Sequence, residues 1–168
     1  MDEHVHSIQP IQFKDFIPLI VIYSLVFMFV GIKQLIYGYD IMLAMRDFMG
    51  ALFVIFGGFK LINIRAFAEA YSSYDIIAKR SRIYGYVYPF LEVILGILFL
   101  KNLYPFYTAV FTILLMAISS IGVLKVLMSK ETITCACLGV VFKIPMTYVT
   151  LLENVLMLVM ALAMLFMQ

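Results

Sequence analysis

Long apolar runs separated by short polar stretches dominate the chain. A membrane-spanning helix needs about 20 mainly apolar residues, within a range of about 17–25. Five segments approach or reach this length, namely Phe16–Ile36, Phe48–Ile64, Ile83–Leu100, Leu103–Leu124 and Ile144–Met167. The second is short, and as a re-entrant segment it would leave four spans. The pattern therefore predicts an all-α membrane bundle of four to five transmembrane helices.

The first fifteen residues, MDEHVHSIQPIQFKD, form a polar and acidic tail. A secretory signal peptide would begin with a basic region and would carry a shorter apolar core. We therefore expect the run that begins at Phe16 to remain as the first transmembrane helix. Residues 16–168 are expected to form a single helical-bundle domain.

A shorter amphipathic stretch, RAFAEAYSSYDIIAKRSR, lies between the second and third apolar runs. Its apolar and aromatic side chains recur at helical spacing, and its charged side chains occupy the other side. The apolar set is Phe67, Ala70, Tyr71, Tyr74, Ile77 and Ala78. This pattern predicts an interfacial amphipathic helix on the membrane surface. A plain helical extension into solvent is the alternative.

Composition agrees with a membrane protein and excludes several classes. The chain is 65% hydrophobic and 13% charged, with a mean hydropathy of +1.07. Soluble domains are about half apolar and about a quarter charged. The net charge of +2 comes without a basic tract, so nucleic-acid binding is not expected. Histidine occurs only at His4 and His6, and no hydrolase motif is present, so ordinary hydrolase chemistry is not expected.

The placement of lysine and arginine predicts an orientation. With five spans, the loops and helix ends on one side carry nine cationic residues and those on the other side carry three. The first set is Lys14, Lys60, Arg65, Lys79, Arg80, Arg82, Lys125, Lys130 and Lys143, and the second is Lys33, Arg46 and Lys101. Cytoplasmic loops carry the excess of positive charge. We therefore expect the N-terminus and the loop after the fourth helix to be cytoplasmic.

Three ionisable residues lie within apolar runs, namely Lys60, Glu92 and Glu153. Such residues are costly in a bilayer and are functional candidates by default. Both glutamates fall about nine residues into their segments, which is roughly 13 Å deep at 1.5 Å per residue. Equal depth would allow the two glutamates to share a site, which Asn63 and Asn154 could complete. A structural ion pair, a proton or cation relay, and a quinone-headgroup site all remain open.

Three stretches within residues 46–167 have a familiar pattern, namely RDFMGALFVIFGGFKLIN, FAEAYSSYDIIAKRSRIYGYVYPFLEVILGILFL and CACLG. Together they resemble the MauE/DoxX family of small integral membrane proteins. It implies a helical bundle in a bacterial inner membrane. MauE is tied to maturation of the disulfide-rich methylamine dehydrogenase, and DoxX relatives are associated with quinol oxidation or thiol redox. The family's thiol motif is commonly CGCFG-like, whereas Ala136 replaces the glycine here.

The only two cysteines, Cys135 and Cys137, are one residue apart in the loop before the last helix. A disulfide between them would close a very small ring and would be easily reduced, which suits exchange. Two thiolates could instead hold Cu(I), which prefers soft ligands. A third possibility is small apolar filler. A cytoplasmic loop would disfavour a standing disulfide, because thiols there are kept reduced.

The methionines and the two histidines are weaker metal candidates. Methionines recur at helical spacing in the last helix, at Met157, Met160, Met164 and Met167, and around the start of the second, at Met42, Met45 and Met49. Thioethers suit Cu(I), but such a stripe is more typical of packing. His4 and His6 in the tail are secondary candidates as metal ligands.

The interpretation that combines these features is a membrane accessory protein for thiol redox or soft-metal handling. Cys135 and Cys137 would exchange disulfides or bind metal, and Glu92, Glu153 and Lys60 would form the polar centre behind them. Cu(I) or a quinone would be the cofactor, and a thiol-redox or metal-carrier protein the partner beside the lipid bilayer. A stand-alone enzyme is not expected. The alternatives are a copper-binding or copper-transport protein and a structural subunit of a membrane complex.

Overall fold

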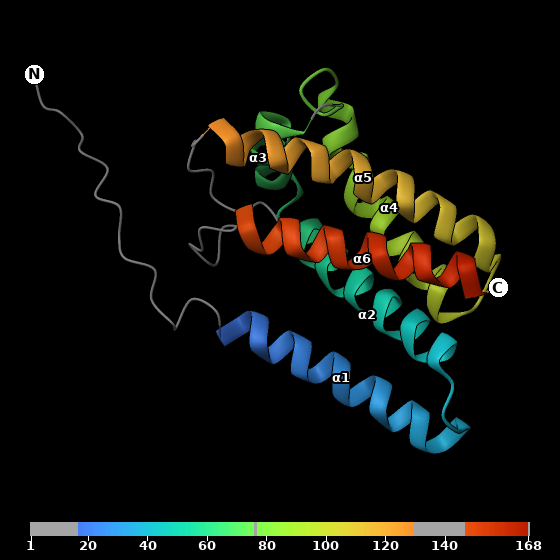
Figure 1. The fold of residues 1–168 in the computed structure, drawn as a ribbon. Helices are drawn as coiled ribbons and strands as arrows, with labels where there is room; N and C mark the ends of the chain where they lie inside the picture. Colours follow the sequence, from blue (N-terminus) through green and yellow to red (C-terminus); the bar gives the residue numbers. More distant parts are fainter. Residues whose placement is uncertain (1–16, 76, 130–146, 168) are drawn as a thin grey trace, which may run out of the picture.

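Six α-helices make up the fold of the described residues, which are 17–75, 77–129 and 147–167 of a computed structural model (Figure 1). They are α1 (Ile17–Tyr37), α2 (Ile41–Ile62), α3 (Ile64–Tyr74), α4 (Arg82–Leu100), α5 (Pro105–Ser129) and α6 (Thr147–Met167). Four of them, α1, α2, α4 and α5, are long and apolar enough to cross a membrane, and α6 adds the apolar stretch Leu151–Met167. The predicted all-α membrane bundle is confirmed.

Successive long helices run in opposite directions (Figure 1). The start of α1, all of α3, the end of α5 and the start of α6 lie at one end of the bundle, which we call the α3 end. The connections from α1 to α2 and from α4 to α5 lie at the opposite end, together with the end of α6. The exposed cations Arg65, Lys79, Arg80, Arg82 and Lys125 therefore share the α3 end.

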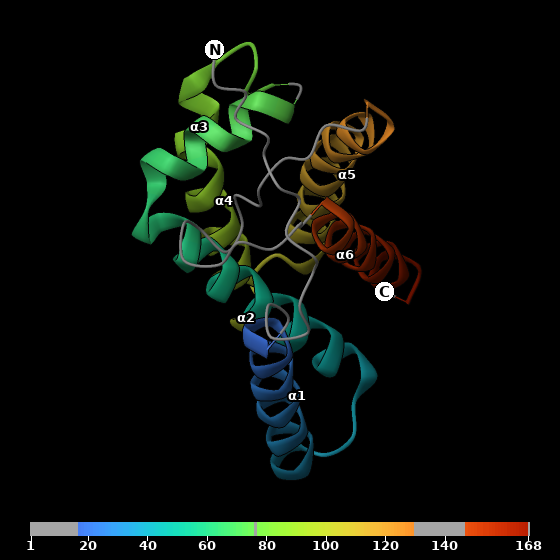
Figure 2. The same cartoon turned by 90° about the vertical axis from the view of Figure 1, so that its left-hand side faces the viewer.

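Two helix pairs, α2 with α4 and α5 with α6, form the most extensive contacts in the bundle. The pairs meet where α2 packs on α6 and α4 packs on α5. Helix α1 packs mainly on α2 and extends away from the other helices in Figure 2. Among its side chains only Ile22 and Val26 are buried. In a bilayer, the exposed apolar side chains of α1, such as Leu25, Met28 and Leu35, would contact lipid.

Glycines allow α2 and α4 to approach closely. A Cβ on Gly50 would lie 2.9 Å from the carbonyl oxygen of Gly96, and a Cβ on Gly96 would lie 2.8 Å from that of Gly50. Small residues commonly permit such backbone contact between membrane helices. A Cβ on Gly57 would lie 2.8 Å from Cγ2 of Val93. In contrast, a Cβ on Gly58 would meet nothing within 4 Å.

Helix α2 begins at Ile41, whereas the hydropathy pattern placed its start at Phe48. Asp40 caps this earlier start by accepting hydrogen bonds from the backbone N–H groups of Met42 (2.8 Å) and Leu43 (3.4 Å). The resulting helix has 22 residues, which is long enough to span a bilayer.

Two charged residues inside α2 account for the difference. Asp47 is buried and pairs with Nζ of Lys33 on α1 at 2.8 Å. Arg46 donates to the carbonyl oxygen of Met42 at 3.2 Å and to the side chain of Asn102 after α4. Asp47 is thus neutralised by a lysine of another helix, and Arg46 is hydrogen-bonded to a residue distant in sequence. The local pattern therefore indicated a loop where the structure has a helix.

The short helix α3 buries its aromatic face against α4. Phe67 and Tyr71 are each 2% exposed, and their rings lie 6.1 Å and 4.6 Å from the ring of Tyr88. Gly85 of α4 lies against Ala68 and permits this contact. The amphipathic pattern therefore produces a helix, but its aromatic side chains pack on protein.

Candidate functional site

A buried ion pair joins α2 to α4 near the α3 end. Nζ of Lys60 lies 2.5 Å from Oε1 of Glu92, and the two residues are 5% and 4% exposed. The pairing follows from the helix contact. Gly57 lies one turn before Lys60, and a Cβ on Gly57 would lie only 3.2 Å from Cβ of Glu92. Low exposure makes the attraction strong, but it also makes each charge costly if the other is removed.

Aromatic rings surround the ammonium group of Lys60. Its Nζ lies 5.1 Å from the ring centroid of Tyr88 and 5.5 Å from that of Phe67. Cations within about 6 Å of a ring face are attracted by its quadrupole. The rings thus replace part of the hydration that the ammonium group loses on burial. The sequence did not predict that aromatic rings would flank Lys60. The available signal was the one-turn spacing of Phe67 and Tyr71, and of Tyr84 and Tyr88, which places aromatic rings on one face of each helix.

A small cavity adjoins the ion pair where the two helix pairs meet. Its volume is about 20 Å³, and its lining residues come from α2, α4, α5 and α6. They are Leu52, Phe53, Phe56, Lys60, Glu92, Met116, Glu153, Asn154 and Met157. A buried water needs about 10–15 Å³ of such space. The cavity therefore suits a water molecule, and a quinone ring would enter only if the helices separated.

The polar groups around this cavity differ in their hydrogen bonding. Oε2 of Glu92 is buried and has no hydrogen-bond partner among the described residues. Nδ2 of Asn154 donates to Oγ of Ser119 at 3.0 Å, which joins α6 to α5. Glu153 is partly buried beside them. The arrangement can hold a water near the second oxygen of Glu92. Side chains from all four helices line the cavity, and the two polar contacts join α2 to α4 and α5 to α6.

The structure brings together four of the polar residues selected from the sequence, namely Lys60, Glu92, Glu153 and Asn154. Asn63 does not join them. It is exposed and caps α3 by accepting a hydrogen bond from the backbone N–H of Ala66 at 3.3 Å. Its position at the junction of α2 and α3 requires this capping, so the prediction that it completes the polar cluster is wrong.

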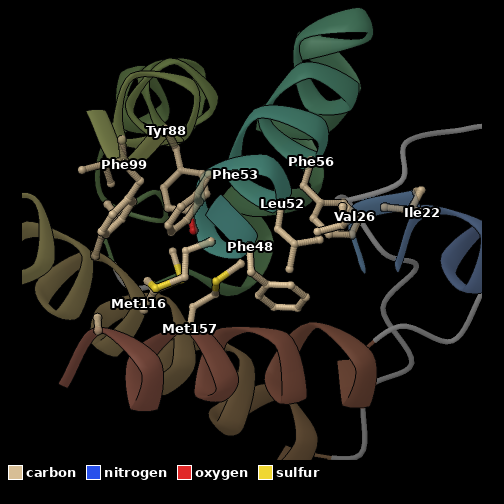
Figure 3. Packing of buried hydrophobic residues seen from close by; sticks show 14 of the residues in the cluster. Ile22, Val26, Phe48, Leu52, Phe53, Phe56, Tyr88, Phe99, Met116 and Met157 are labelled. Atoms are coloured by element: carbon tan, nitrogen blue, oxygen red, sulfur yellow. The ribbon is translucent and has the colours of Figure 1, made fainter. Parts of the chain in front are cut away.

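The sulfur-containing candidates fall into two groups. Met49, Met157 and Met164 are buried within the hydrophobic core, which agrees with a packing role. Figure 3 shows Met116 of α5 and Met157 of α6 in the same buried cluster as Phe48 and Phe53 of α2. Cys135 and Cys137 lie outside the described residues, as do His4 and His6.

Comparison with protein families gives a match over residues 38–167, to the family described as methylamine utilisation protein MauE. The chain belongs to the MauE family. The match includes α2 to α6 and the cysteine pair, and it leaves α1 outside. It begins eight residues earlier than the resemblance over 46–167 suggested. Comparisons with curated proteins and with solved structures gave no match.

Membership of this family and the apolar helices identify an integral membrane protein. In this MauE-family protein the matched region contains two candidate functional sites. One is the cavity beside Lys60 and Glu92, and the other is the pair Cys135 and Cys137. The first is built by the fold, and the second is a feature of the sequence between the end of α5 and the start of α6.

Proposed function

We propose that this MauE-family protein is a membrane accessory protein in methylamine utilisation that exchanges disulfides through Cys135 and Cys137. The observation that carries the proposal is the position of the chain's only two cysteines, one residue apart within the family-matched region. They belong to the segment that connects α5 to α6, and both helices meet that segment at the α3 end.

The proposed reaction is thiol–disulfide exchange with a partner protein. A thiolate of the partner attacks the Cys135–Cys137 disulfide, which breaks that bond and forms a mixed disulfide. The second thiol of the partner then attacks the mixed disulfide, leaving an oxidised partner and a reduced Cys135/Cys137 pair. The electron pair passes from the partner to this chain, and the protons balance across the exchange. A disulfide of a thiol-redox carrier protein regenerates the pair by the reverse reaction.

The short spacing favours such an oxidising role. A disulfide that closes a very small ring has poor geometry and is readily reduced. Reduction would be favoured on a cytoplasmic face, where thiols are kept reduced. The exchange reaction therefore requires either a transient cytoplasmic disulfide or an orientation opposite to the one that the lysine and arginine counts predict.

In this proposal the Lys60–Glu92 ion pair has a structural role, because it stabilises the contact between two helices of the bundle. It joins α2 to α4, while Asn154 joins α6 to Ser119 of α5. The second contact joins the two helices that precede and follow the cysteine segment in the sequence. A further role as proton donor and acceptor for Lys60, Glu92 and Glu153 is a separate hypothesis, and a double variant tests it below.

Trapping experiments test the exchange function. With Cys137→Ser or Cys135→Ser, one of the two variants should accumulate in cells a mixed disulfide with the oxidised carrier protein, because the second thiol of this chain, which would resolve that intermediate, is gone. The matched control is the variant with both substitutions, which should trap nothing. Maleimide reagents that do or do not cross the membrane would show on which side the thiols lie.

Two results would overturn the proposal. If no variant traps a partner and the wild type binds one Cu(I) that the double serine variant loses, the thiols handle a soft metal. If the double serine variant retains full function in cells and neither exchange nor Cu(I) binding is seen, the protein is a structural subunit.

A further inference from the structure

The α3 end of the bundle exposes a cluster of cationic side chains, which we call the basic surface. It consists of Arg65, Lys79, Arg80, Arg82 and Lys125. Among the described residues at this end, Glu69 is the exposed acidic residue, whereas Asp75 is fully buried. The surface therefore carries a clear excess of positive charge and favours an anionic ligand.

The turn that carries Lys79 and Arg80 is held in place by buried polar contacts. Oδ1 of Asp75 accepts hydrogen bonds from the backbone N–H groups of Ile77 and Ala78, both at 2.9 Å. Oδ2 of Asp75 accepts a hydrogen bond from the hydroxyl of Tyr71 at 2.9 Å. These contacts position the two cations on a fixed turn, which reduces the conformational freedom lost when a ligand binds.

Exposed apolar side chains flank the cations along the chain. Ile62 at the end of α2 is 79% exposed, and Ile83 is 73% exposed directly after Arg82 at the start of α4. Tyr86 and Val87 continue this exposed apolar surface along α4. Cations beside apolar side chains match the boundary between lipid headgroups and acyl chains.

We propose that the basic surface binds the headgroups of anionic phospholipids. The phosphates would contact Lys79, Arg80 and Arg82, while Ile62 and Ile83 would contact the acyl chains below them. A free phosphate or a soluble acidic protein would use the cations but would leave the isoleucines exposed. The membrane-spanning helices already place lipid beside this surface, so a lipid headgroup satisfies both halves of it.

Lipid titration monitored by native mass spectrometry tests this proposal. The full chain in neutral detergent would be titrated with phosphatidylglycerol or with phosphatidylcholine, and the bound lipid counted. Each cation near an anionic membrane surface contributes about a fivefold effect on binding. Lys79→Gln should therefore weaken phosphatidylglycerol binding about fivefold, and Lys79→Gln with Arg80→Gln about 25-fold.

The matched control is Lys101→Gln, which removes an exposed lysine at the opposite end of the bundle. This variant should bind phosphatidylglycerol like the wild type, and millimolar inorganic phosphate should not displace the lipid. The proposal is overturned if the two lipids bind equally well, or if all variants behave alike. It is also overturned if inorganic phosphate displaces phosphatidylglycerol, or if the cations are needed only for binding an acidic protein.

Discussion

Breaking the Lys60–Glu92 pair from one side should destabilise the bundle far more than removing both charges. In Lys60→Met, Glu92 would keep its carboxylate at 4% exposure without the ammonium group that lies 2.5 Å away. Removing one partner of a buried pair typically costs about 3–5 kcal/mol. The lost attraction to the rings of Tyr88 and Phe67 acts in the same direction. The free energy of unfolding of native proteins is about 5–15 kcal/mol in total, so this loss would be a large part of it.

The double variant, Lys60→Met with Glu92→Leu, removes both desolvation costs. Replacing a buried pair by apolar residues of similar size is often neutral or stabilising by about 1–4 kcal/mol. The coupling energy of the double-mutant cycle should therefore be large, on the order of 3 kcal/mol or more.

Unfolding in mixed detergent micelles, followed by the helical circular dichroism signal, measures the free energies of unfolding of the wild type, the two single variants and the double variant. A cost below about 1 kcal/mol for Lys60→Met, which is typical of an exposed pair, would refute the reasoning from burial. The same proteins separate the structural role from a proton-transfer role. If the stable double variant exchanges disulfides at the wild-type rate, Lys60 and Glu92 have no chemical role. If it is stable but inactive, they do.

Two further predictions concern packing and capping. Gly57→Leu should lower the free energy of unfolding by about 1–3 kcal/mol, because even a Cβ at this position would clash with α4. Gly58→Leu should be nearly neutral, because a Cβ there would meet nothing within 4 Å. Equal effects of the two leucines in the same micelle assay would contradict the proposed contact. Asp75→Ala should cost about 1–3 kcal/mol, because it leaves the hydroxyl of Tyr71 and two backbone N–H groups without their acceptor. Unchanged protease resistance and stability of this variant would show that the turn does not depend on Asp75.

Helix positions were largely predictable, because hydrocarbon thickness demands long apolar runs. The exception is informative. The polar residues Arg46 and Asp47 lie in the first turns of α2, and the partners that compensate them come from α1 and from the turn after α4. A window along the sequence contains neither partner. The predicted start of α2 was therefore several residues too far along the chain. Because the predicted segment was correspondingly short, a re-entrant segment remained possible.

The candidate site was predictable in part. Counting residues along the third and fifth apolar runs placed Glu92 and Glu153 at equal depth, and the structure puts both at one cavity. The same approach failed for Asn63, because proximity in sequence to Lys60 does not reveal that a helix end needs its side chain as a cap. The aromatic rings around Lys60 were missed for a related reason. An amphipathic stretch looks alike whether its apolar face meets lipid or protein.

The sequence alone therefore established the class of protein, a bundle of four to five apolar helices, and the charged residues within them, since these depend on local composition and on the thickness of the bilayer. The partner of each buried charge was decided by the tertiary structure. Lys60 meets Glu92 because Gly50, Gly57 and Gly96 let two helix backbones approach, and that contact joins residues 32 positions apart. Pairing energies in a low-dielectric interior depend on a few ångströms, and only packing sets those distances.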